Sequence, residues 1–192
     1  MVSPTKLAHV VYRTHRFAEM IDWYTTVLEA KVSHNNGTLA FLSWDDEHHR
    51  LAILNLGTSD DPVSATGVGV HHVAYTWDTL SALLETYERL RDVGIKPVVK
   101  LRHGMTLSMY YADPDGNQSE LQIDILTPDA ADEFMLSDAF RANPIGETFD
   151  PEELLIAFKA GEDVTPLLFR SDQDPVAVPA AQGAGIKGRT TP

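Results

Sequence analysis

The stretch Val70-His71-His72-Val73-Ala74-Tyr75 organises the sequence, because a near copy of it lies upstream at Leu7-Ala8-His9-Val10-Val11-Tyr12. His9 and His72 take the same place in the two copies, 63 residues apart. Alternate side chains of a β-strand point to one face, so each histidine is directed to a defined side. A repeated strand with an inward histidine can bring two imidazoles to one point, which is the beginning of a metal site.

The pattern that follows each copy is repeated as well. Each strand is followed by a helical stripe of apolar residues, with Thr14 and Asp78 as expected N-caps and Gly94 as the second helix stop. Tyr24 and Tyr87 share the offset of 63 residues, which keeps the register through both helices. Three further strands follow each helix. The strands are expected at 5–13, 31–34, 39–44 and 50–56 in the first copy, and at 69–76, 97–102, 107–111 and 118–125 in the second.

The sequence therefore predicts an α+β fold of two tandem βαβββ modules of about 60 residues each. The modules span 5–56 and 69–126, joined by a linker at 57–68. Since one such unit has a sheet face to cover, the two are expected to depend on each other.

The pattern changes after Leu126, and residues 127–170 are expected to form a helical extension. One helix is predicted over 130–141, and a second begins at Asp150 and stops at Gly161. Residues 171–192, rich in Ala, Gly and Pro, are expected to form a flexible tail.

Composition narrows the function classes. The formal charge of −13 argues against a nucleic-acid binder, which would present a basic face. The absence of cysteine excludes disulfides, thiolate metal sites and a cysteine nucleophile. With no export signal and no apolar run long enough to span a bilayer, the chain is expected to be soluble and cytoplasmic, without a membrane partner.

Glu120 lies inside an apolar strand segment, Ser119-Glu120-Leu121-Gln122-Ile123. A buried glutamate is costly unless it is paired or bound to a metal. Together with His9 and His72 it makes a facial set of two imidazoles and one carboxylate, which suits Fe(II) oxygen chemistry. Similar groups hold zinc, manganese or magnesium, so ligand type alone leaves the metal open. Taken singly, each of these residues is more often structural than functional; the repeat is what favours a site.

On these residues the chain resembles the vicinal oxygen chelate superfamily, which includes glyoxalase I, extradiol dioxygenases, fosfomycin-resistance proteins and bleomycin-binding proteins. The resemblance covers about residues 5–126. It implies that the modules form a curved mixed sheet, with a metal held by His9, His72 and Glu120 in the cup between them.

Two further stretches resemble the extradiol branch of that superfamily. The segment 45–52 is similar to the one that holds its acid–base histidine, which here is His49. The segment 103–110 is similar to the one carrying a substrate-contacting histidine and tyrosine, here His103 and Tyr110, and Tyr110 lies ten residues before Glu120. From the residues alone, His49 could equally be a solvated turn residue and Tyr110 a packing residue. Asn143-Pro144-Ile145-Gly146 also matches small one-domain members, without a chemical role.

The resemblance implies an Fe(II)-dependent extradiol ring-cleaving dioxygenase of aromatic catabolism, acting with O2 on a catechol or a 2,3-dihydroxybiphenyl-type diol. The partners expected from the resemblance are the diol and O2, together with further copies of the chain in a homo-oligomer. A glyoxalase-like lyase is disfavoured because the strand at 50–56 carries no acidic ligand. A fosfomycin-type transferase remains the alternative, although it lacks a counterpart of residues 127–170 and of His103. A non-enzymatic bleomycin-type binder is disfavoured by the intact set of three ligands.

Overall fold

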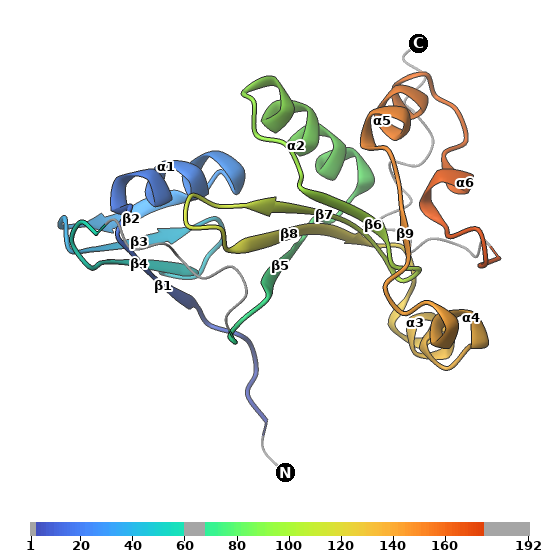
Figure 1. The fold of residues 1–192 in the computed structure, drawn as a ribbon, viewed down its shortest axis with the longest axis horizontal. Coiled ribbons are helices and arrows are strands. Elements are labelled where there is room, and N and C mark those ends of the chain that lie inside the picture. Colours follow the sequence, from blue (N-terminus) through green and yellow to red (C-terminus); the bar gives the residue numbers. More distant parts are fainter. Residues whose placement is uncertain (1–2, 60–67, 175–192) are drawn as a thin grey trace. The chain divides into compact units, whose positions relative to one another are not determined.

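The structure, a computed structural model, describes residues 3–59 and 68–174 and groups the chain into two units (Figure 1). The first unit comprises the chain up to residue 69 together with residues 112–117. The second comprises residues 70–111 and the chain from residue 118 onward. Each unit contains one βαβββ module, so the predicted α+β class and the duplication are confirmed.

The first unit has a four-stranded sheet in the order β1-β4-β3-β2. The pairing of β1 with β4 is parallel, and the remaining pairs are antiparallel. Helix α1 covers the sheet with a buried stripe that includes Met20 and Tyr24, at the spacing expected of an amphipathic helix. The elements are β1 (Val10–Thr14), α1 (Phe17–Val27), β2 (Lys31–Asn35), β3 (Leu39–Ser43) and β4 (Leu51–Asn55).

The second unit repeats this arrangement in the order β5-β8-β7-β6 and adds a short strand, β9, beside β6. Here too the first and last strands of the module, β5 and β8, are parallel. The buried stripe of α2 includes Leu83, Tyr87 and Leu90, as predicted. The elements are β5 (His72–Thr76), α2 (Leu80–Asp92), β6 (Val99–Arg102), β7 (Thr106–Ala112), β8 (Gln118–Asp124) and β9 (Glu147–Thr148).

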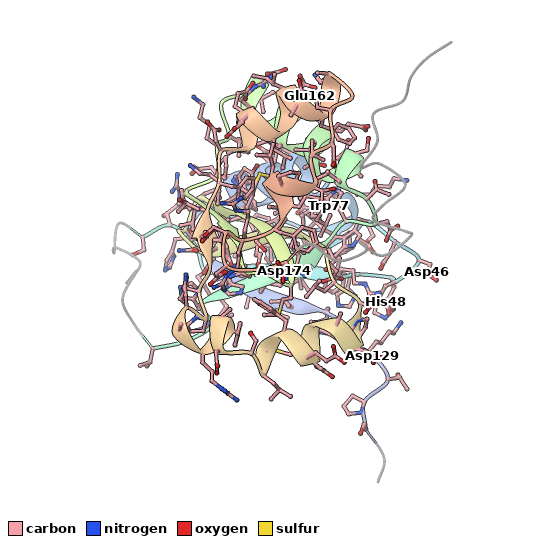
Figure 2. The ribbon with its side chains drawn as sticks, turned by 90° about the vertical axis from the view of Figure 1, so that its right-hand side faces the viewer. Asp46, His48, Trp77, Asp129, Glu162 and Asp174 are labelled. Carbon is pink, nitrogen blue, oxygen red and sulfur yellow. The ribbon has the colours of Figure 1, made fainter. Side chains whose placement is uncertain are left out.

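The C-terminal extension belongs to the second unit. Helix α5 packs on α2, and helices α3 and α4 pack on each other. The α3–α4 pair lies apart from α5: Figure 2 shows the labelled Asp129 of α3 far from Glu162, which follows α5. The helices are α3 (Pro128–Met135), α4 (Asp138–Ala142), α5 (Pro151–Lys159) and α6 (Thr165–Leu168).

The prediction of one helix over 130–141 is wrong, because two helices occupy this stretch. Ser137 separates them: its side chain accepts a hydrogen bond from the Phe140 N–H and caps α4. The start at Asp150 is confirmed, with its side chain accepting from the Glu152 N–H, and the stop at Gly161 is confirmed by its left-handed φ of 74°.

Both predicted N-caps of the module helices are displaced by one or two residues. Helix α1 begins after Arg16, and Thr14 instead ends β1, with its hydroxyl accepting from the Arg16 N–H. Helix α2 is capped by Thr79 rather than Asp78, and the Thr79 hydroxyl accepts from the Ala82 N–H. In α2 the neighbouring Asp78 and Thr79 are both suitable N-cap residues, so the sequence alone does not separate them, whereas α1 begins without a side-chain cap.

Most of the predicted linker and of the predicted C-terminal tail lies outside the described residues. Ser171, Asp172 and Gln173 are described, and each makes hydrogen bonds within the second unit. In the part of the chain that the structure covers, no helix is long and apolar enough to cross a membrane.

A buried pair in the first unit joins α1 to the turn at residues 112–117. The Tyr24 hydroxyl donates to an Asp113 carboxylate oxygen at 3.0 Å, and Tyr24 is fully buried. Asp113 also accepts from the backbone of Asp115 and Asn117, although burial raises the pKa of its carboxyl group. A buried carboxylate with several donors is fixed in place, so this pair should contribute to stability.

Replacing Tyr24 with phenylalanine is expected to lower the free energy of unfolding by about 1.5 kcal/mol, since a hydrogen bond to a charged group is lost in the interior. Urea unfolding followed by tryptophan fluorescence measures the change. Tyr111→Phe is the matched control, because the equally buried Tyr111 hydroxyl contacts a weak acceptor, the Met109 sulfur, at 4.0 Å. Equal losses in the two variants would contradict the assigned role of the Tyr24–Asp113 pair.

Candidate active site

The predicted ligands of the second module are brought together by the pairing of β5 with β8. Glu120, on β8, is 5% exposed, and His72 is the first residue of β5. The parallel register sets Ala74 opposite Glu120, and the His72 Nε2 lies 3.0 Å from the Glu120 Oε2. An imidazole and a buried carboxylate in this arrangement match the mixed nitrogen and oxygen donors of a divalent-metal site.

Tyr110 and His103 lie against the same carboxylate. The Tyr110 hydroxyl, on β7, is 2.9 Å from the His103 Nε2, which is itself 3.9 Å from the Glu120 Oε1. The Tyr110 ring also meets the His72 ring edge-on, with centroids 5.3 Å apart. Burial, with the negative charge of Glu120 as a second cause, raises the pKa of the Tyr110 phenol, which therefore keeps its proton near neutral pH.

His103 has a second fixed contact on its other ring nitrogen. Its Nδ1 lies 2.6 Å from the backbone oxygen of Ile145. A carbonyl oxygen only accepts, so Nδ1 must carry a proton. In the neutral ring Nε2 then accepts from the Tyr110 hydroxyl.

His49 is placed in the first unit, between two other rings. Its ring centroid lies 4.4 Å from that of His9 and 4.3 Å from that of Phe41, on which it stacks. Burial, followed by the positive charges that His9 and His48 can carry, lowers the pKa of His49. His48 is exposed in the turn before β4, where Figure 2 labels it. The structure thus brings the predicted acid–base residue next to the predicted ligand of the same module.

Two expectations about the strand histidines need correction. Strand β1 begins at Val10 rather than at residue 5, so His9 lies just before it and is exposed. The Arg50 guanidinium donates to the carbonyls of Leu7 and Ala8 and replaces a strand partner there. The strand expected at 69–76 would place His71 and His72 on opposite faces. Strand β5 begins only at His72, so alternation does not apply to His71, and the two Nδ1 atoms lie 2.8 Å apart.

His9 belongs to the first unit, and His72 and Glu120 to the second. Within residues 3–59 and 68–174, no group of three or more histidine, cysteine or acidic side chains is arranged to hold a metal ion. The metal site formed by His9, His72 and Glu120 therefore stays a prediction. The pair of His72 and Glu120 within the second unit has the donor atoms and the burial that fit a metal.

The stretch Asn143-Pro144-Ile145-Gly146 had no predicted role, although it matched small one-domain proteins. The structure provides one, because the Ile145 carbonyl accepts the His103 Nδ1 proton. No side-chain pattern reveals a backbone acceptor, so the only available signal was the match itself.

Two βαβββ modules, with a buried carboxylate beside imidazole and phenol groups in the second, define a paired-module α+β protein with a candidate metal site. A family model described as the Glyoxalase/Bleomycin resistance protein/Dioxygenase superfamily matches residues 6–121. The chain belongs to this superfamily.

Relatives in sequence and in structure agree with this assignment. "Biphenyl-2,3-diol 1,2-dioxygenase 2" of Rhodococcus globerulus is 47% identical over 165 residues, covering 85% of this chain and 87% of the relative. "Biphenyl-2,3-diol 1,2-dioxygenase 3" of the same organism is 41% identical over 174 residues, covering 89% and 91%. A glyoxylase/bleomycin resistance protein/dioxygenase domain from Frankia sp. EAN1pec has a similar fold, with a TM-score of 0.52 at 19% identity, covering 64% of this chain and 93% of that domain.

Proposed function

We propose that this protein is an extradiol dioxygenase that opens the ring of a catechol or a 2,3-dihydroxybiphenyl-type diol with O2, using Fe(II) held by His9, His72 and Glu120. The observation that carries the proposal is the similarity to two biphenyl-2,3-diol dioxygenases over most of both chains. The cluster around Glu120 supports it chemically, since buried carboxylates need a partner and His72 is already in contact.

The donor set fits ferrous iron in the sense that two neutral imidazoles and one carboxylate leave coordination positions open. When bound, Fe(II) would supply those open positions to the diol and to O2 and would pass electrons from the diol, which is the net reductant, to O2. The same donors would also accept zinc or manganese, so metal analysis is part of the test.

The remaining residues handle the protons and orient the diol. A diol must lose protons as it binds, and His49 is the group proposed to take and return one, because an imidazole titrates near neutral pH. Tyr110 keeps its phenol proton, and a substrate oxygen would have to replace the His103 Nε2 as the acceptor of this single donor. His103, fixed on Nδ1 by the Ile145 carbonyl, directs Nε2 toward Tyr110 and Glu120.

The proposal predicts about one iron per chain in protein purified without oxygen, and a yellow ring-fission product from 2,3-dihydroxybiphenyl. Metal analysis and visible absorbance measure the two. Chelation should abolish the product, and ferrous iron alone should restore it. Bound zinc or nickel together with turnover of a thiohemiacetal would instead support a glyoxalase-type lyase, and thiol transfer to fosfomycin would support the transferase.

A further inference from the structure

The Ile145 carbonyl that holds His103 belongs to a tightly closed loop. The Asn143 side chain spans the loop twice: its amide nitrogen donates to the Gly146 oxygen at 2.8 Å, and its oxygen accepts from the Gly146 N–H at 3.0 Å. Gly146 has a φ of 99°, and a Cβ there would meet the Arg102 oxygen at 2.1 Å. Only glycine therefore lets this loop lie against the end of β6, next to His103.

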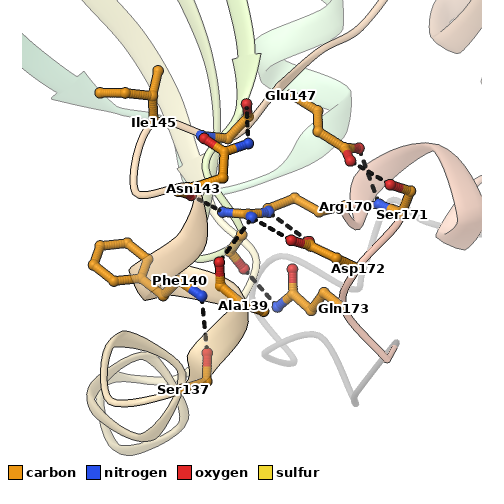
Figure 3. A network of polar contacts seen from close by, with 12 residues as sticks. Ser137, Ala139, Phe140, Asn143, Ile145, Glu147, Arg170, Ser171, Asp172 and Gln173 are labelled. Carbon is orange, nitrogen blue, oxygen red and sulfur yellow. Dashed lines mark hydrogen bonds and ion pairs between the residues drawn. The ribbon is translucent and has the colours of Figure 1, made fainter.

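A buried arginine from the end of the extension holds the same loop (Figure 3). Arg170 is 2% exposed. Its guanidinium donates to the backbone oxygen of Asn143 at 2.7 Å and to the backbone oxygen of Ala139 at 3.4 Å. The same group lies 3.5 Å from the backbone oxygen of His103. The Arg170 guanidinium thus links the backbone of His103 to the backbone of the loop at 143–146. The Ile145 carbonyl of that loop holds the His103 ring.

The charge of Arg170 is balanced locally. Asp172 accepts from its Nε at 2.8 Å and from its Nη2 at 2.6 Å, and the Phe134 ring lies 5.5 Å from the guanidinium carbon. Gln173 then donates to the Gly104 oxygen at 2.8 Å, directly after His103. A buried arginine with this many partners has one geometry, and none of these partners is a proposed metal ligand.

We propose that Arg170 is a positioning residue that, by holding the loop at 143–146 against the end of β6, keeps the Ile145 carbonyl on the His103 Nδ1. The His103 proton is thereby fixed on Nδ1, and Nε2 faces Tyr110 and Glu120. The catalytic meaning of this arrangement rests on the proposed function, but the arrangement itself does not. It gives the C-terminal extension a specific role in the site.

The test compares ring protonation in the full-length, metal-free protein by long-range ¹H–¹⁵N spectra of ¹⁵N-histidine samples, with His103→Gln identifying the His103 signals. The wild-type ring should show the pattern of a proton on Nδ1 and an acceptor at Nε2. In Arg170→Met this pattern should give way to exchange between the two tautomers. The kcat for diol cleavage in the iron-loaded enzyme should fall about 10-fold, with KM changed less than about threefold, as for the loss of an outer partner that orients a histidine.

Arg141→Met is the matched control, because Arg141 on the neighbouring helix is exposed and pairs with Asp138 on its own helix. Its spectra and kcat should match the wild type. Arg170→Lys is the second variant: it keeps a positive charge beside Asp172 but lacks the fork of donors that reaches both Asn143 and His103, so it decides the matter if Arg170→Met does not fold.

Wild-type His103 signals in Arg170→Lys, or in a folded Arg170→Met, would overturn the positioning role. A wild-type chain that cleaves no diol would overturn the proposed function alone, since the tautomer comparison needs no turnover.

Discussion

A protein in which Glu120 is replaced by glutamine is expected to lose its bound iron and to cleave diol at least about 100-fold more slowly. Loss of an outer partner of a metal ligand costs about 10- to 100-fold, and loss of the ligand itself should exceed that. Glutamine keeps the shape of the side chain but removes the only negative charge in the proposed set. Iron content by metal analysis and the rate of yellow product formation measure both effects.

The same change should leave the fold intact, which separates loss of metal from loss of structure. Glu120 is buried against His72, and a neutral amide of the same shape is easier to bury than a carboxylate without its metal. A glutamine can still hydrogen-bond the His72 imidazole, so the free energy of unfolding of the metal-free chain should change by less than about 1 kcal/mol.

Glu152→Gln is the matched control for this experiment. Glu152 lies in the same unit and is bound by Arg91 at 2.8 Å and by the Tyr87 hydroxyl at 3.1 Å, away from the site. It should keep its iron and its rate. Wild-type iron in Glu120→Gln would remove Glu120 from the ligand set and with it the proposed ring-cleavage chemistry.

The parts of this molecule that the sequence predicted are those encoded by repetition. The stretch around His72 has a copy at His9, and the offset of 63 residues carries through Tyr24 and Tyr87, which both prove to be buried in equivalent helices. The position of Glu120 in the strand that contains Leu121 and Ile123 likewise raised the possibility of its burial, and the side chain is 5% exposed.

The parts that were missed depend on contacts between distant segments. The Ile145 carbonyl reaches His103 across 42 residues, and Arg170 reaches the His103 backbone across 67. Neither leaves a periodic or compositional trace, since a backbone oxygen is present at every residue. The break at Ser137 was missed for a different reason: serine is tolerated within a helix, and only its hydrogen bond to the Phe140 N–H marks it as a cap.

Replacing His49 with phenylalanine is expected to slow ring cleavage by about 10²- to 10⁴-fold while iron stays bound, because the group proposed to accept and return the substrate proton is removed. Phenylalanine preserves the ring contacts with His9 and Phe41, which keeps the neighbouring proposed ligand in its setting. Steady-state kcat and iron per chain, measured on the same preparation, separate chemistry from metal binding.

His34→Phe is the control that isolates the proton-transfer role. His34 is an exposed histidine of β2 whose ring also meets Phe41, at 5.8 Å, so both substitutions exchange an imidazole for a benzene ring beside the same aromatic residue. Only the His49 variant should lose turnover. If both variants turn over diol at the wild-type rate, His49 has no part in proton transfer; if His49→Phe loses iron as well, its ring acts through His9 rather than on the substrate.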